Sequence, residues 1–203
     1  MNTFIKSLVV GGLSLACVAA SGATVFAQDD TLPVQKPFRV KLGGLFGGGE
    51  VKGANGIEIG KIDYRFSAGI AYDFSKTNAT SPVLFNIYAD YFTGSDDKTI
   101  NNVKVDSEAT TFAIGIGARY LFAPAVGTAG QPYGELGLGY YSTKLDIGSS
   151  DDTEGGLGGK IALGYQLSMG LFGEVEYTIV DKFSKGGVDY EPSGIRASIG
   201  YRF

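Results

Sequence analysis

Apolar and polar side chains alternate one by one along much of the chain, and the last residues show this most clearly. Odd positions from Ile195 to Phe203 are apolar, whereas the even positions from Gly194 to Arg202 hold only glycine, serine or arginine. Successive side chains of a β-strand point to opposite faces. The pattern therefore predicts a closing strand with one apolar face and one polar face.

Seven earlier segments alternate in the same way and are separated by stretches rich in turn residues. With the closing strand, the predicted strands are 38–46, 61–74, 83–92, 108–122, 133–145, 157–167, 171–179 and 194–203. Many of them reach the roughly 9–11 residues that a tilted strand needs to cross a bilayer. The predicted fold is all-β, an eight-stranded antiparallel up-and-down barrel.

The connectors between the predicted strands alternate in length. The longer ones are polar or glycine-rich and cover 46–60, 93–107, 146–156 and 180–192, and the shorter ones cover 75–82, 123–132 and 168–170. Long loops at one end and short turns at the other are typical of barrels that cross the bacterial outer membrane. This parity predicts that both chain ends lie at the short-turn end, on the periplasmic side.

The first 27 residues predict a cleavable secretory signal peptide. Lys6 supplies the positive charge, an apolar stretch follows over 7–20, and small residues favour cleavage after Ala27, with a cut after Ala23 as the alternative. The apolar stretch is shorter than the roughly 20 residues of a membrane-spanning helix. We expect a short periplasmic lead-in over 28–36 and the barrel domain over 37–203.

Composition narrows the function. The chain has no histidine, which excludes a histidine-based catalytic triad, general base or zinc ligand. Its single cysteine, Cys17, lies in the predicted signal peptide, so the mature chain has no thiol chemistry. The formal net charge of −4 offers no positive excess for nucleic acid. The 32 glycines and 25 tyrosines and phenylalanines suit many short strands.

Side-chain size predicts which face of the barrel points outward. The polar face is rich in small residues, which a narrow lumen favours, whereas the apolar face carries large residues. Aromatic residues also fall near the strand ends, as expected for two belts at the membrane interfaces. The belt at the short-turn end comprises Phe38, Tyr72, Phe74, Phe85, Tyr120, Phe122, Tyr133, Tyr201 and Phe203, and the other Tyr64, Phe66, Tyr91, Phe112, Tyr140 and Tyr177. A soluble lipocalin-like barrel, with its apolar face inside, is the alternative.

Charged residues of both signs occupy the inward face, and an approximate register pairs them. It sets Arg119 opposite Glu135, Arg39 opposite Asp73, Glu176 opposite Arg196, Lys160 diagonal to Glu176, and Arg65 diagonal to Asp90. Buried charges should pair, because an isolated buried charge is costly. We interpret the pairs as a structural network that plugs the lumen. The alternative is a gated polar pore in which a pair breaks.

The strand pattern, the connector asymmetry and the terminal Tyr201-Arg202-Phe203 resemble the small outer-membrane barrels of OmpA/OmpX and opacity-protein type. The resemblance covers roughly 37–203, although this chain lacks tryptophan and the periplasmic wall-binding domain of longer relatives. It implies a structural or adhesion-like role at the cell surface, with a narrow porin-like channel as the alternative. It also implies contact with outer-membrane lipid and lipopolysaccharide, a possible extracellular ligand at the long loops, and recognition of Phe203 by the barrel assembly machinery.

No catalytic, cofactor-binding or metal-binding residues are predicted. The segment 155–160 partly matches a phosphate-binding loop, but Glu154 replaces its first glycine and Ile161 its final serine or threonine. Small barrels that modify lipid A rely on a catalytic histidine, which this chain lacks. We therefore expect a protein that is not an enzyme and needs no cofactor.

Overall fold

The computed structural model describes residues 36–53, 55–62, 64–74, 82–100, 103–122, 130–147, 150–185 and 187–203. The predicted signal peptide over 1–27, and all but the last residue of the predicted lead-in, lie outside these ranges. The cleavage site therefore stays a prediction.

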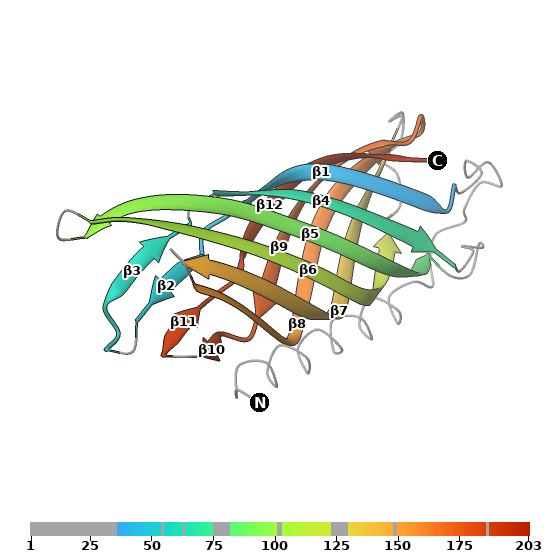
Figure 1. Cartoon of the computed structure of the whole chain (residues 1–203). Helices are drawn as coiled ribbons and strands as arrows, with labels where there is room; N and C mark the ends of the chain where they lie inside the picture. The colour runs from blue at the N-terminus through green and yellow to red at the C-terminus, as the bar shows by residue number, and fades with distance from the viewer. Residues whose placement is uncertain are drawn as a thin grey trace.

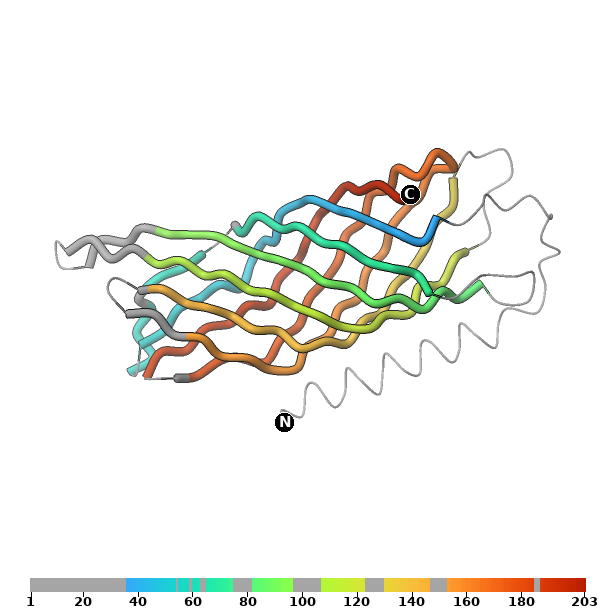
Figure 2. The backbone as a smooth tube through the Cα atoms, turned by 45° about the vertical axis from the view of Figure 1, so that its right-hand side comes forward, coloured from blue at the N-terminus to red at the C-terminus, as the bar shows by residue number. Residues whose placement is uncertain are grey.

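Eight antiparallel strands close into a barrel, as predicted (Figures 1 and 2). Neighbouring barrel strands follow one another along the chain. The barrel strands are β1 (Phe38–Phe46), β4 (Tyr64–Asp73), β5 (Val83–Ile100), β6 (Val103–Leu121), β7 (Gly130–Ile147), β8 (Ser150–Leu167), β9 (Leu171–Val180) and β12 (Gly194–Arg202). The order around the barrel is β1-β12-β9-β8-β7-β6-β5-β4.

The barrel closes where β12 pairs with β1. The backbone N–H of Phe38 donates to the carbonyl of Phe203 at 3.0 Å, and the N–H of Phe203 donates back to Phe38 at 2.9 Å. Their rings stack with centroids 6.0 Å apart. This pairing places both strand ends at one end of the barrel, which we call the terminal end; the opposite end is the loop end.

The outer wall of the barrel is apolar. Ile116 on β6 and Ile199 on β12 are 64% and 71% exposed, whereas Arg119 and Arg196 on the same strands are fully buried inside. The predicted faces are therefore confirmed. A water-soluble barrel would put these apolar side chains inside, so the lipocalin-like alternative is wrong.

Aromatic side chains ring both ends of this apolar wall, with one correction. Phe38, Tyr72 and Phe85 are exposed at the terminal end, and Phe66, Phe112 and Tyr177 toward the loop end. Tyr133 was predicted to join the terminal-end belt but is 1% exposed and points into the barrel. Tyr133 precedes Glu135 by two residues on β7, so both side chains lie on the face of the strand that points into the lumen.

The distance between the two aromatic belts matches a membrane. From Phe112 on β6 to Phe122, which directly follows the strand, the chain measures about 33 Å at about 3.3 Å per residue. A strand tilt of about 40° reduces this to a height of about 25 Å, close to the apolar band of outer-membrane barrels.

The structure corrects the predicted long connectors, which form further strands. Strands β5 and β6 remain paired up to Ile100 and Val103, and β7 and β8 up to Ile147 and Ser150. The two remaining connectors form a four-stranded sheet, which we call the lid sheet. Its strands, in the order β10-β11-β2-β3, are β2 (Glu50–Lys52), β3 (Glu58–Lys61), β10 (Phe183–Lys185) and β11 (Val188–Tyr190).

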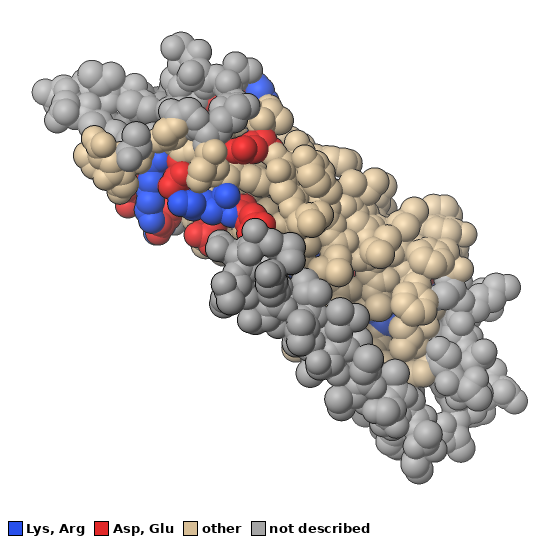
Figure 3. Space-filling view, turned by 90° about the horizontal axis from the view of Figure 1, so that it is seen from below, with Lys and Arg blue, Asp and Glu red and all other residues tan. Residues whose placement is uncertain are grey.

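The polarity of the barrel inverts at the loop end. There the apolar side chains face inward and pack together, in a cluster of Leu45, Val51, Ile62, Phe92, Ala109, Ala113, Tyr141, Val180, Phe183 and Tyr190. Charged side chains lie outside, and they gather at this end of the molecule in Figure 3. Outward side chains are no longer apolar here. The predicted strands, which were placed by that rule, therefore end too early. The inversion is what a barrel rising from lipid into water requires.

Gly115 on β6 marks a place where the lumen has no room for a side chain. A Cβ there would lie 2.3 Å from the backbone oxygen of Leu138 and 2.5 Å from the Tyr88 ring. We expect Gly115→Ala to destabilise the barrel by about 1–3 kcal/mol, because the backbone oxygen cannot move aside. Urea unfolding of the refolded protein measures this.

Gly134→Ala is the matched control, since its Cβ would meet only side-chain carbons at 3.6 Å or more. Its unfolding midpoint should equal that of the unsubstituted protein. Equal midpoints for both variants would contradict the close packing of the lumen.

Candidate functional site in the barrel lumen

Charged side chains fill the interior of the barrel. Among the described residues, seven cations and five carboxylates are buried. They are Arg39, Lys41, Arg65, Arg119, Lys160, Arg196 and Arg202, with Asp73, Asp90, Glu135, Glu174 and Glu176. Each of the eight barrel strands contributes at least one of them. The charges thus connect the whole circumference of the barrel.

A central group forms around Asp90 and Glu176. The guanidinium of Arg196 contacts Asp90 at 3.0 Å and Glu176 at 2.5 Å. The ammonium of Lys160 lies 3.1 Å from Asp90 and 3.5 Å from Glu176. Since Asp90 is on β5 and Glu176 on β9, these cations bridge separate walls of the barrel.

Lys41 completes the central group. Its ammonium lies 2.5 Å from Glu174, 3.0 Å from Glu176 and 3.8 Å from Asp90. Three cations therefore meet three carboxylates. Such mutual compensation is what makes buried charges tolerable.

A second group lies nearer the terminal end. Arg39 contacts Asp73 at 3.2 Å and Glu135 at 3.0 Å, and Glu135 also accepts from Arg119 at 3.0 Å. Arg202 contacts Asp73 at 2.7 Å. The contact between Arg39 on β1 and Glu135 on β7 crosses the lumen, because these strands stand opposite each other in the ring.

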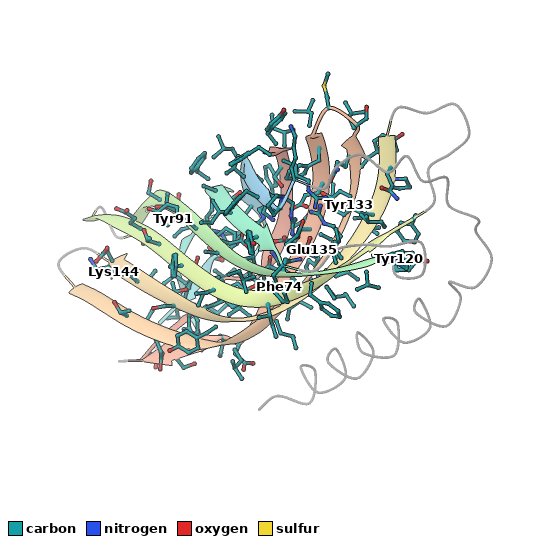
Figure 4. All side chains as sticks on the ribbon, turned by 90° about the vertical axis from the view of Figure 1, so that its right-hand side faces the viewer. Phe74, Tyr91, Tyr120, Tyr133, Glu135 and Lys144 are labelled. Carbon is teal, nitrogen blue, oxygen red and sulfur yellow. The ribbon has the colours of Figure 1, made fainter. Side chains whose placement is uncertain are left out.

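Aromatic side chains line the same space. The guanidinium of Arg119 lies 3.9 Å from the centre of the Tyr133 ring, a distance typical of a cation–π contact. The Tyr133 hydroxyl donates to Glu174 at 2.8 Å. Tyr133 and Glu135 both lie inside the barrel, and Lys144 lies farther along the same strand, at the loop end (Figure 4). Tyr133 thus links the two groups of charges.

Four of the five predicted charge pairs are confirmed. Arg119–Glu135 and Arg196–Glu176 are also direct neighbours in the strand register. Lys160–Glu176 forms across a diagonal, as predicted, whereas Arg39–Asp73 forms although Arg39 lies opposite Ala71 in the register. Long side chains reach diagonal neighbours on a sheet, so the approximate register sufficed.

The predicted pairing of Arg65 with Asp90 is wrong. Asp90 is opposite Gly69 in the register, deeper in the barrel than Arg65. Arg65 instead donates to the carbonyl oxygens of Gly47 at 2.6 Å, Pro192 at 2.8 Å and Ser193 at 2.8 Å. These acceptors belong to the two segments that carry the lid sheet. Alternation along a strand contains no signal for such loop carbonyls.

Tyr190 joins Arg65 beneath the lid sheet. The guanidinium of Arg65 donates to the Tyr190 hydroxyl at 3.1 Å. Burial raises the pKa of Tyr190, so this hydroxyl stays neutral in neutral solution. Arg65 therefore fastens both arms of the lid sheet through neutral acceptors.

Across the described residues, no cluster of three or more potential metal ligands occurs. Within the same ranges, no helix is both long enough and apolar enough to span a membrane. The expectations of no catalytic, cofactor-binding or metal-binding residue stay predictions.

A closed barrel with charges inside, large apolar residues outside and aromatic belts at both rims defines a transmembrane β-barrel. The sequence matches the family described as outer membrane protein beta-barrel domain over residues 13–203. The chain belongs to this family, which places it in the outer membrane.

Two solved structures of bacterial proteins are similar to this chain. Neisserial surface protein A is 16% identical with a TM-score of 0.50, covering 82% of this chain and 97% of its own. The attachment invasion locus protein Ail of Yersinia pestis, in complex with the heparin analogue sucrose octasulfate, is 14% identical with a TM-score of 0.45, covering 84% and 100%. Comparison with the curated proteins gave no match. At such low identity, the likeness to Neisserial surface protein A concerns the fold alone.

Glu176 is the carboxylate with which the stability of the network can be tested. Glu176→Gln removes the partner of Arg196, Lys41 and Lys160 and leaves an uncompensated buried positive charge. We expect a loss of about 3–5 kcal/mol in the free energy of unfolding. Urea titration of the refolded protein, followed by its gel mobility, measures it.

Glu50→Gln is the control for this loss, because Glu50 pairs with Lys52 on the exposed lid sheet. Exposed pairs contribute little, so its midpoint should stay unchanged. A Glu176→Gln variant as stable as this control would show that the network does not stabilise the barrel.

Proposed function

We propose that the protein is a non-conducting barrel that presents its loop end at the cell surface for contact with another molecule or cell. The observation that carries this proposal is the inverted polarity of the loop end. A packed apolar cluster lies inside it and charged side chains lie outside, so it is a folded platform and not a set of loose loops.

Two separate layers support a closed lumen. The charged network bridges the middle of the barrel, where Arg196 and Lys160 contact both Asp90 and Glu176. The apolar cluster beneath the lid sheet closes the loop end, and Arg65 holds the lid segments in place. An eight-stranded barrel is only wide enough to be filled by side chains. Both layers favour the plugged interpretation over the channel.

The outer face of the lid sheet favours a polar partner. Glu50 pairs with Lys52 at 2.6 Å, and Lys182 pairs with Asp189 at 2.6 Å. The hydrogen bond from Lys52 lowers the pKa of Glu50, so both members of the pair are charged in neutral solution. Alternating charges of this kind suit a hydrated, charged ligand and not a lipid surface. In the described part of this face, Lys52 and Lys182 are both paired with carboxylates, which does not favour nucleic acid.

The remaining partners follow from the outer wall and its ends. The apolar wall suits outer-membrane lipid, and the loop-end rim suits the lipopolysaccharide leaflet. Phe203 is 51% exposed at the terminal end, and we propose that the barrel assembly machinery recognises it there. Since the loop end is the platform, we propose that both chain ends are periplasmic. The absence of histidine supports a protein without catalytic activity.

Single-channel recording tests the closed lumen. We expect no conductance steps from the refolded protein, from Arg196→Gln or from Arg65→Gln, because each single change leaves the other layer in place. Arg196→Gln should instead lower the unfolding midpoint. Stable steps from the unsubstituted protein would contradict the proposal, and steps from Arg196→Gln alone would identify the network as a gate.

Cysteine labelling tests the orientation. The single cysteine lies in the predicted signal peptide, so an introduced thiol stands alone in the mature chain. Lys182→Cys on the lid segment should react with a membrane-impermeant maleimide on intact cells. Met169→Cys, 66% exposed in the turn between β8 and β9, should react only after permeabilisation. The reverse pattern would show that the loop end faces the periplasm.

A further inference from the structure

The charges in the lumen do not balance within the group nearer the terminal end. Arg39, Arg119 and Arg202 share two carboxylates, Asp73 and Glu135. The central group, in contrast, has equal numbers of cations and carboxylates. Among the described residues, one positive charge of the terminal-end group therefore has no carboxylate of its own. An unneutralised charge away from water is costly.

Unused hydrogen-bond donors occur in the same group. The Nε of Arg39 and one terminal nitrogen of Arg119 are buried and have no hydrogen-bond partner among the described residues. A buried donor without an acceptor costs free energy, so each favours an additional acceptor nearby. The excess charge and the unused donors are separate observations: the first favours an anion and the second an acceptor, and Arg39 contributes to both.

A cavity lies beside Arg39. Its volume is about 10 Å³, and its lining includes Arg39, Lys41, Lys160, Tyr88, Asp90 and Glu135. This is room for a single water molecule or a single monatomic ion, and for no larger particle. Three of the lining side chains are cations.

The two carboxylates of the lining do not reserve the cavity for a cation. Asp90 is already contacted by Lys160 and Arg196, and Glu135 by Arg39 and Arg119. Their negative charge is thus compensated before anything enters the cavity. A further cation would add to the positive excess, whereas an anion would remove it.

We propose that this cavity binds one small monovalent anion of the halide class, with chloride as the physiological candidate. Arg39 supplies a donor, and the lysines supply a favourable potential. Sulfate, phosphate and organic anions are too large for the volume. The bound anion makes the terminal-end group neutral and stabilises the folded barrel, because it binds the folded state and not the unfolded chain.

Unfolding in different salts tests this site on the refolded protein. We expect the urea midpoint to rise with chloride or bromide concentration relative to sodium gluconate at equal ionic strength. Arg39→Gln removes the excess charge and should lose this difference. Arg65→Gln, outside the group, should keep it, which separates the site from general salt effects. Equal midpoints in chloride and gluconate, or a chloride effect that persists in Arg39→Gln, would overturn the proposal.

Crystals grown in sodium bromide give a test that does not depend on whether Arg39→Gln folds. We expect an anomalous bromide peak in the cavity between Arg39 and Lys160. A cavity that holds water without an anomalous peak, at a bromide concentration that labels surface sites, would overturn the proposal.

Discussion

A strand inside a lipid bilayer can satisfy its backbone hydrogen bonds only with neighbouring strands, so a sheet in lipid must have no edge. In this chain, the pairing of β12 with β1 meets that constraint, and the reciprocal bonds between Phe38 and Phe203 complete it. Once the sheet is closed, alternate side chains must point to lipid or to the lumen. The apolar wall, the charged interior and the aromatic rims all follow from this closure.

The narrow lumen then decides which side chains can share it. Long charged side chains cross it, and glycines opposite them on the neighbouring strands make room for them. A Cβ at Gly69 would lie 2.8 Å from the Lys41 side chain, and one at Gly137 would lie 2.9 Å from that of Lys160. Because each buried charge needs an opposite charge, the network connects strands that are far apart in sequence. The same side chains that balance charge therefore fill the lumen.

The faces of the eight strands could be predicted because the two-residue period of a strand determines which residues share a face. Four of the charge pairs could be predicted because the connectors set approximately which residues of adjacent strands are neighbours. Arg65 could not be placed, because its partners are loop carbonyls that no alternation encodes. The lid sheet and the long hairpins were missed because polarity inverts above the membrane, where Val51 and Phe183 face inward. Tyr133 was misplaced because an aromatic near a strand end suggested a membrane belt, although its parity pointed to the lumen.

The inversion of polarity between the barrel wall and the loop end is the central claim, and the absence of tryptophan makes it directly measurable. Single tryptophans would replace Ile116 in the apolar wall and Glu108 farther along the outward face of β6, with the protein refolded into vesicles of brominated lipid. The account predicts strong quenching of Ile116→Trp by the lipid bromines and quenching of Glu108→Trp only by aqueous iodide. Iodide quenching of Ile116→Trp without any effect of brominated lipid would contradict it.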